Sequence, residues 1–287
     1  MLKILLWFVA NDFRFLKDAL KILERQQGGL ELIGSATGEN ISKVDTEDVD
    51  ILLVVGAREF NMSGVTDAAR EFKIPEEKLL GDWIVCIPGF TLEKYRQLQR
   101  SRLSIFSRNC FGGCISNLLG LQFRSPFVNL FLGGTDFVKF LHAPRIYLAK
   151  EPTFEKLDGT SKEAPDGYPV LSLGNILLNM MHYKNPDEAI AKWNERKQRI
   201  NWQNLFVTMY TDSEKTAREF DSLPFEKKVC FVQFKSDLNS AWYINPEADK
   251  DAPCLRDRMD NFGWGKIFYY DLFDMLLYGK KTPLIEM

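Results

Sequence analysis

Apolar runs of strand length alternate with segments of helical periodicity in the first part of this chain, and this alternation strongly constrains its fold. Residues 2–9 form a nearly continuous apolar run, and the next apolar side chains recur at the spacing of one helix face: Phe13, Leu16, Leu20 and Leu23. Asp12 stands where a helix N-cap is expected. Further apolar runs at 30–33 and 49–55 precede a helical segment at 64–73. Alternating strands and helices favour a parallel sheet with right-handed crossovers, so the sequence predicts an α/β protein.

The chain divides into two predicted domains near Pro88-Gly89, which is followed by a helical run at 91–101. Residues 1–90 are expected to form a small Rossmann-like domain. Its first turn, Val9-Ala-Asn-Asp-Phe, has no G-x-G-x-x-G motif, so this domain either binds a nucleotide in another way or is a scaffold. Residues 91–287 are expected to form a larger α/β domain.

Composition and charge exclude several classes of protein. The 287 residues carry a net charge of −2, which leaves no basic excess for neutralising phosphates and argues against a nucleic-acid partner. The apolar run at the N-terminus is too short to span a bilayer and resembles a signal peptide poorly, so a cytoplasmic protein is expected. Five scattered cysteines favour reduced thiols, and their spacing does not indicate a zinc site.

The segment 103–120 carries the strongest local signal, because an apolar strand runs into a polar turn with two glycines and then into an apolar helix. Backbone N–H groups at such a helix start can bind an anion or an oxyanion. Ser107, Asn109 and Cys110 would lie at the mouth of this site. Relief of turn strain explains the pair Gly112-Gly113 equally well. Cys110 is either a nucleophile at a helix N-terminus or a buried, inert thiol.

Two blocks of sequence resemble one known family. The first holds Ser107-Arg-Asn-Cys-Phe-Gly-Gly, Leu119-Gly-Leu, Ser125-Pro-Phe-Val-Asn-Leu and Asp136-Phe-Val-Lys-Phe-Leu. The second holds His182-Tyr183, Glu188-Ala189, Trp193, Arg196, Arg199-Ile-Asn201 and Asn204-Leu-Phe-Val. In this order they resemble an uncharacterised family, domain of unknown function 1919, whose members are labelled exopolysaccharide biosynthesis proteins. The resemblance implies a pathway for capsule, lipopolysaccharide or exopolysaccharide, and it implies no particular reaction.

Histidine is scarce in this chain, which narrows the search for a proton carrier. Of His142 and His182, the second is the better candidate, because it follows the strand-like run 173–181 and precedes a helix that Asn185 is expected to cap. It can also simply cap backbone groups. On the helix 186–199, one side carries a cationic stripe of Lys192, Arg196 and Arg199, which either clamps an anion or is a solvated face. The resemblance favours a functional role for both arginines and Asn201.

The sequence therefore predicts a cytoplasmic transferase that modifies a sugar precursor or glycan of a surface polysaccharide. Its partner would be a nucleotide-linked or lipid-linked sugar, and glycosyl, acyl and phosphoryl donors all remain open. Neither a cofactor nor a metal is expected. The alternative is a non-catalytic protein that binds nucleotide-sugars or assists assembly in the same pathway. The predicted catalytic residues are His182, Asp136, which can instead be a helix N-cap, and Cys110; the predicted ligand-binding residues are Ser107, Asn109, Gly112, Gly113, Ser125, Arg196, Arg199 and Asn201.

Overall fold

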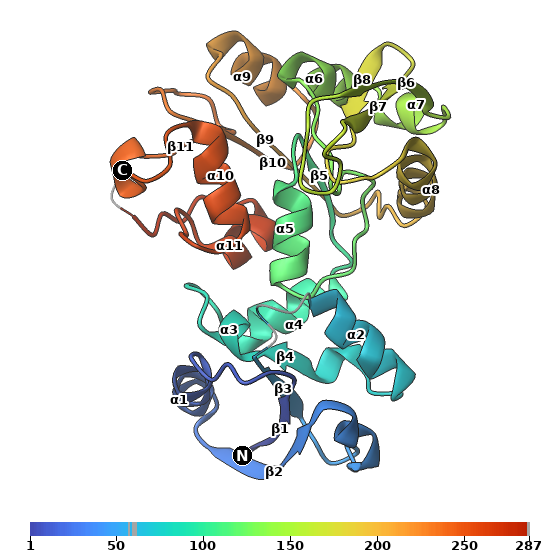
Figure 1. The fold of residues 1–287 in the computed structure, drawn as a ribbon. Coiled ribbons are helices and arrows are strands. Elements are labelled where there is room, and N and C mark those ends of the chain that lie inside the picture. Colours follow the sequence, from blue (N-terminus) through green and yellow to red (C-terminus); the bar gives the residue numbers. More distant parts are fainter. Residues whose placement is uncertain (57, 59–61, 286–287) are drawn as a thin grey trace. The chain divides into compact units, whose positions relative to one another are not determined.

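The chain is organised as two compact units (Figure 1), and the computed structural model describes residues 1–56, 58 and 62–285. Unit 1 consists of Met1–Ser101 with Ser116–Gln122, and unit 2 consists of Arg102–Ile115 with Phe123–Met287. The domain boundary expected at residue 90 stays a prediction. Each unit is described by itself below.

Unit 1 is built on sheet A, in which four strands run parallel in the order β2-β1-β3-β4. The strands are β1 (Leu2–Phe8), β2 (Leu30–Thr37), β3 (Ile51–Val55) and β4 (Leu79–Gly81). All five residues of β3 are buried, which explains its unbroken apolar sequence. The helices of this unit are α1 (Leu16–Gln27), α2 (Met62–Glu71), α3 (Asp82–Val85) and α4 (Leu92–Arg100), with the short turns η1 (Gly38–Lys43) and η2 (Glu76–Lys78).

The start of α1 differs from the sequence prediction. Asp12 does not cap the helix, which begins at Leu16 with Phe15 in the N-cap position. Instead, Oδ1 of Asp12 accepts hydrogen bonds from the backbone N–H and the Nε of Arg14, at 3.2 and 2.8 Å. A short carboxylate side chain can bond to its own backbone two residues on, and here this local turn replaces the cap.

Unit 2 is built on sheet B, whose four parallel strands follow the order β11-β10-β9-β5. These strands are β5 (Ser104–Ser107), β9 (Leu205–Tyr210), β10 (Lys227–Val232) and β11 (Ala241–Tyr243). The parallel sheets of both units confirm the expected α/β class. Helices of this unit are α6 (Gly134–His142), α7 (Pro144–Leu148), α8 (Pro186–Lys197), α9 (Glu214–Asp221), α10 (Leu255–Gly263) and α11 (Leu272–Tyr278), with the short turn η3 (Pro246–Ala248); α5 (Phe111–Leu118) begins in it.

A second sheet in unit 2, sheet C, is antiparallel. It consists of β6 (Thr153–Asp158), β7 (Tyr168–Leu173) and β8 (Ile176–Asn179) in the order β6-β7-β8. The run 173–181, which the sequence analysis treats as one strand-like segment, is interrupted because Gly174 has φ +68° and begins a tight turn between β7 and β8. His182 therefore follows an antiparallel strand.

The core of unit 2 is rich in aromatic side chains packed around Phe127. This ring lies 4.8 Å from Phe140, 5.3 Å from Phe106 and 5.6 Å from Trp193, measured between ring centroids. All four side chains are almost completely buried. Two of these contacts, with Phe140 and Trp193, are edge-to-face, and such contacts stabilise a core beyond the area they bury. Part of the Ser125-Pro-Phe-Val-Asn-Leu motif is thereby explained by packing.

Candidate functional site

The turn that follows β5 is held together by its own side chains. Ser107 is fully buried; its Oγ donates to the carbonyl of Asn109 at 2.7 Å and accepts the N–H of Gly112 at 3.1 Å. The Oδ1 of Asn109 accepts the N–H of Phe111 at 3.4 Å. Two backbone N–H groups at the start of α5 are thus already hydrogen-bonded within the turn. This structural role explains why Ser107 and Asn109 are polar without invoking a ligand.

Both glycines of the turn allow close packing. A Cβ at Gly112 would lie 2.7 Å from Cγ2 of Ile105 and 2.7 Å from Oγ of Ser107. A Cβ at Gly113 would lie 3.2 Å from Cγ1 of Val128. The helix α5 can approach β5 and the 125–132 segment this closely only because these positions lack side chains. Their predicted role in ligand binding stays a prediction.

Cys110 lies at the end of this turn in a largely desolvated place. Its Sγ is 3.7 Å from the carbonyl oxygen of Leu130. Burial, reinforced by the negative charge of Asp260, raises the pKa of the Cys110 thiol to about 12. The group is therefore protonated near neutral pH, which weakens it as a nucleophile.

His182 approaches the same segment from sheet C. Its backbone N–H donates to the carbonyl of Asn129 at 3.3 Å, one residue before the Leu130 carbonyl that Cys110 contacts. Asn129 has φ +64°, a left-handed conformation that this residue type tolerates better than most. The structure thus brings His182 and Cys110 to neighbouring residues of one segment.

The imidazole of His182 is paired with a carboxylate that the sequence analysis did not select. Nδ1 of His182 lies 3.0 Å from Oε2 of Glu163, and both side chains are partly exposed. This hydrogen bond lowers the pKa of Glu163. A carboxylate on Nδ1 fixes the ring orientation and leaves Nε2 as the acceptor, the arrangement used by many general bases. Glu163 lies in the polar segment before β7, and its charge alone gave no signal.

Asp260 in α10 is the second residue that sequence reasoning missed. Its Oδ1 accepts a long hydrogen bond from Nδ2 of Asn109, at 3.4 Å. Burial raises the pKa of this carboxyl, while the positive charges of Arg256 and Lys266 oppose the rise. The group lies in electrostatic range of His182, where a carboxylate stabilises an imidazolium. The charge-dense sequence Arg256-Asp-Arg-Met-Asp260 resembles a solvated helix face, which concealed it.

Arg196 is buried, unlike the rest of its predicted stripe. Its Nη1 donates to the Tyr183 hydroxyl at 2.6 Å, and its guanidinium carbon lies 5.4 Å from the centre of the Phe123 ring. The Tyr183 hydroxyl in turn donates to the carbonyl of Val128 at 3.0 Å. Arg196 therefore fixes the residue next to His182 and the segment before Asn129, so it is a positioning residue in this geometry.

Two other predicted ligand-binding residues, Arg199 and Asn201, bond to other parts of unit 2. Arg199 pairs with Glu195 and reaches the carbonyl of Phe123 at 3.5 Å. Asn201 donates its N–H to Oγ of Ser104, at the amino end of β5, whereas Asn109 and Cys110 follow the carboxyl end of that strand. The structure therefore does not place Asn201 with them.

Ser125 and Asp136 have local partners. Oγ of Ser125 accepts the N–H of Phe127 at 3.2 Å, a turn-forming bond. Oδ2 of Asp136 accepts the N–H of Leu177 in β8 at 3.1 Å, and Oδ1 accepts from Lys139 at 3.2 Å. Asp136 is the third residue of α6, whose N-cap is Gly133, so the alternative reading of Asp136 as the N-cap is wrong.

The polar site so defined, called here the 110–182 cluster, consists of Asn109, Cys110, Glu163, His182 and Asp260. Over residues 1–56, 58 and 62–285, no three His, Cys, Asp or Glu side chains form a group suited to a metal ion. Across the same residues, no helix has the length and apolar character needed to cross a bilayer.

Comparison with known proteins identifies a family whose match spans both resemblance blocks. The chain belongs to the family described as Domain of unknown function (DUF1919), whose sequence model matches residues 85–278. An uncharacterized protein of Haemophilus influenzae (strain ATCC 51907 / DSM 11121 / KW20 / Rd) is 35% identical over 184 residues. This match covers 62% of the chain and 84% of the relative.

Proposed function

We propose that this protein is a transferase that moves a group onto a hydroxyl of a sugar precursor or glycan, with His182 as the general base. The observation that carries the proposal is the Glu163–His182 pair, 3.0 Å between Oε2 and Nδ1, with the half-buried Asp260 in electrostatic range of His182. Proton transfer is the step common to glycosyl, acyl and phosphoryl transfer to an alcohol. The donor class stays open.

In the proposed reaction, Nε2 of His182 accepts the proton of the attacking hydroxyl as its oxygen forms the new bond to the transferred group. The bond between that group and the donor oxygen breaks, and the leaving oxygen takes up a proton from solvent. Glu163 stabilises the imidazolium that forms. Because His182 ends protonated, release of one proton to solvent restores the starting state with no net change in protons.

Covalent catalysis by Cys110 has less support than direct transfer. The thiol is protonated near neutral pH because burial raises its pKa to about 12, and the 110–182 cluster offers it no bonded base. The Gly112-Gly113 pair has a packing explanation. In our proposal Cys110 fills space between the turn and Leu130.

The polysaccharide pathway and the Rossmann-like assignment belong to the same proposal. The pathway follows from the resemblance of the two sequence blocks to proteins labelled for exopolysaccharide biosynthesis. A Rossmann-like unit 1 is supported by the parallel order β2-β1-β3-β4. In this order β1 lies between β2 and β3, so the strand order reverses at β1, as it does in doubly wound sheets. The acceptor or donor would then be a nucleotide-linked or lipid-linked sugar, handled in the cytoplasm.

A second function, binding without turnover, has a specific observation in its favour. The side chains of Ser107 and Asn109 already accept hydrogen bonds from two backbone N–H groups at the start of α5. The turn therefore offers fewer N–H donors to an oxyanion than its sequence indicates. A protein that binds a nucleotide-sugar, or assists assembly in the pathway, would need no such donors.

The test is a transfer assay with the full chain. Purified protein is incubated with nucleotide-sugars, acyl-CoA or lipid-linked sugars and a panel of sugar acceptors, and products are read by mass spectrometry. His182→Gln should reduce turnover at least about a hundredfold, as expected for loss of a general base. Glu163→Gln and Asp260→Asn should give smaller losses.

His142→Gln is the matched control, since His142 is the other histidine and lies exposed in the last turn of α6. It should leave turnover unchanged. Binding of a nucleotide-sugar without turnover by folded wild-type protein would favour the binding function. Full activity of His182→Gln would exclude the general-base role.

A further inference from the structure

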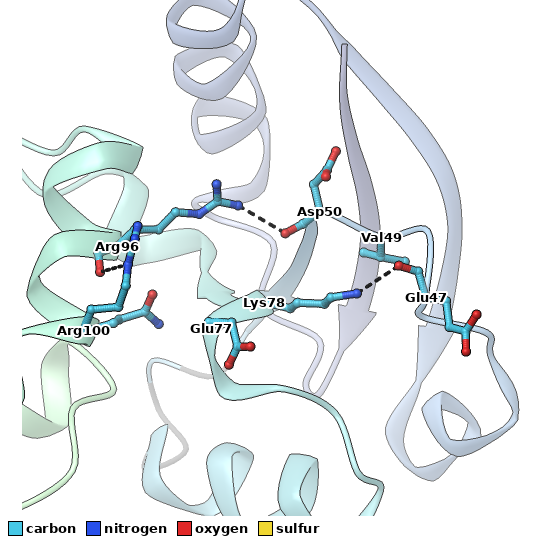
Figure 2. Close-up of a pocket in the computed structure, with 8 residues that line it drawn as sticks. Glu47, Val49, Asp50, Glu77, Lys78, Arg96 and Arg100 are labelled. Atoms are coloured by element: carbon cyan, nitrogen blue, oxygen red, sulfur yellow. Dashed lines mark hydrogen bonds between the residues drawn. The ribbon is translucent and has the colours of Figure 1, made fainter.

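A cavity in unit 1 lies at the amino ends of strands β3 and β4 (Figure 2), on the opposite edge of sheet A from the turns that follow these strands. Its volume is about 600 Å³, within the range of small-molecule sites. The lining residues come from the segments before β3 and β4 and from α4: Glu47, Val49, Asp50, Glu77, Lys78, Arg96, Gln99 and Arg100.

Three cations and three carboxylates line this cavity, but they are not paired with one another. Among the residues that the structure describes, no ion pair joins Lys78, Arg96 or Arg100 to a carboxylate of the lining. Oδ2 of Asp50 accepts the backbone N–H of Lys3 at 2.8 Å. Figure 2 shows the carboxylates of Glu47 and Asp50 turned away from the ammonium of Lys78. The charges that face the cavity are therefore mainly positive.

Within the described part of the chain, Lys78, Arg96 and Arg100 donate hydrogen bonds only to backbone carbonyls. Nη2 of Arg96 donates to the carbonyl of Asp50 at 3.3 Å, and Nε of Arg100 donates to the carbonyl of Arg96 at 3.2 Å. Nζ of Lys78 donates to the carbonyls of Thr46 and Glu47 at 2.7 and 3.0 Å. A guanidinium has five N–H donors, so most donors of both arginines remain available within the described structure.

Arg96 and Arg100 are four residues apart on α4 and so lie on the same helix face. Like charges at this spacing repel and destabilise a helix, and a bound anion removes that repulsion. Two guanidinium forks match the several oxygens of a phosphate group better than they match a single halide ion. Because the cavity is much larger than a phosphate ion, it has room for an organic group attached to it.

We propose that this cavity binds a phosphate ester of a small polyhydroxyl compound, such as a sugar phosphate. Arg96 and Arg100 hold the phosphate, and Lys78 adds positive charge from across the cavity. The hydroxyls donate to the carboxylate of Glu77, with Val49 as the apolar wall. This site is separate from the 110–182 cluster and does not depend on the transferase proposal.

Isothermal titration of the full chain with glucose 1-phosphate, inorganic phosphate and glucose tests the site. Glucose 1-phosphate should bind most tightly, inorganic phosphate should bind at least about fivefold more weakly, and glucose should not bind measurably. The double variant Arg96→Gln/Arg100→Gln should weaken glucose 1-phosphate binding at least about tenfold. The variant Arg96→Lys/Arg100→Lys should bind with an affinity between those of wild type and the double glutamine variant. Lysine restores the positive charge but not the paired N–H donors of the guanidinium.

Arg25→Gln is the matched control, since Arg25 lies exposed in the last turn of α1 in the same unit. It should bind like wild type, and so should His182→Gln, which separates this site from the proposed transferase site. Thermal denaturation checks that each variant is folded. Equal affinity for phosphate and glucose 1-phosphate, no binding by folded wild-type protein, or unchanged affinity of the double glutamine variant would each overturn the proposal.

Discussion

Nη1 of Arg196 donates a hydrogen bond to the hydroxyl of Tyr183 at 2.6 Å, and this contact joins α8 to the residue next to His182. The guanidinium is buried, and none of the described residues forms an ion pair with it. An arginine in this position maintains the local structure, and its truncation leaves a buried hydroxyl with one partner fewer.

Arg196→Ala should therefore lower the free energy of unfolding by about 2 kcal/mol, the cost of a lost buried hydrogen bond and of lost packing on Phe123. Arg199→Ala is the matched variant, at a position just beyond the C-cap Gln198 of α8. It should lose less than about 1 kcal/mol, because its pair with Glu195 is partly exposed. Urea denaturation measures both, and equal losses would contradict the difference in burial.

Gly112→Ala should destabilise the protein by about 1–3 kcal/mol, since its new Cβ would lie 2.7 Å from both Ile105 and Ser107. Gly134→Ala is the control, because a Cβ there has its nearest neighbours at 3.8 Å. That variant should stay within about 0.5 kcal/mol of wild type. Melting curves of the two variants and of wild type measure the loss. An unchanged melting temperature of Gly112→Ala would show that the turn can move away from β5 without loss of stability.

Iodoacetamide should modify Cys254 first in the folded protein, roughly tenfold faster than Cys110. Cys254 is exposed, whereas burial raises the pKa of Cys86 to about 11 and that of Cys110 to about 12. Peptide mass spectrometry at successive times gives the order. Labelling of Cys110 at the rate of Cys254 would restore it as a candidate nucleophile.

Asp82 should make stability fall as the pH rises from about 4 to about 6. Burial raises the pKa of Asp82 to about 6, above the ordinary value near 4 that it has in the unfolded chain. The folded state then holds a proton that the unfolded state releases, so its contribution is complete below pH 4 and is lost as the pH passes through 6.

The corresponding variant is Asp82→Asn, which removes the titration and keeps the shape. Between pH 4 and 7 its unfolding free energy should change less steeply than that of wild type, with a difference of about 2 kcal/mol. Denaturation midpoints across this range provide the comparison. Parallel curves for the two proteins would mean that the Asp82 carboxyl is solvated.

Much of the fold could be predicted because strands buried on both faces have unbroken apolar sequences. The apolar run predicted at 49–55 contains β3, whose five residues are all buried. The cap at Asn185 is also confirmed, since its Oδ1 accepts the N–H of Glu188 at 2.9 Å. Each of these features depends on neighbours in sequence.

The candidate site was harder to predict because its contacts join residues far apart in the chain. Asn109 and Asp260 are separated by 151 positions, and no local pattern marks such a pair. The surroundings of the predicted stripe on the helix 186–199 were hard to predict for a related reason. Periodicity places Lys192, Arg196 and Arg199 on one side, but α8 ends at Lys197, before Arg199. Arg196 is buried because it contacts Tyr183 and Phe123, which lie outside the helix.

The division of the chain has a consequence for how the protein is synthesised. Two buried donors of unit 1, Nε1 of Trp83 and the hydroxyl of Tyr95, bond to the carbonyls of Leu118 and Leu119 at 2.9 and 3.0 Å. A nascent chain released only as far as residue 101 lacks both acceptors, although every strand of sheet A is already present. We therefore expect unit 1 to remain sensitive to proteases on the ribosome until residue 122 has emerged, and a fragment ending at residue 101 to be less stable than one that includes Ser116–Gln122.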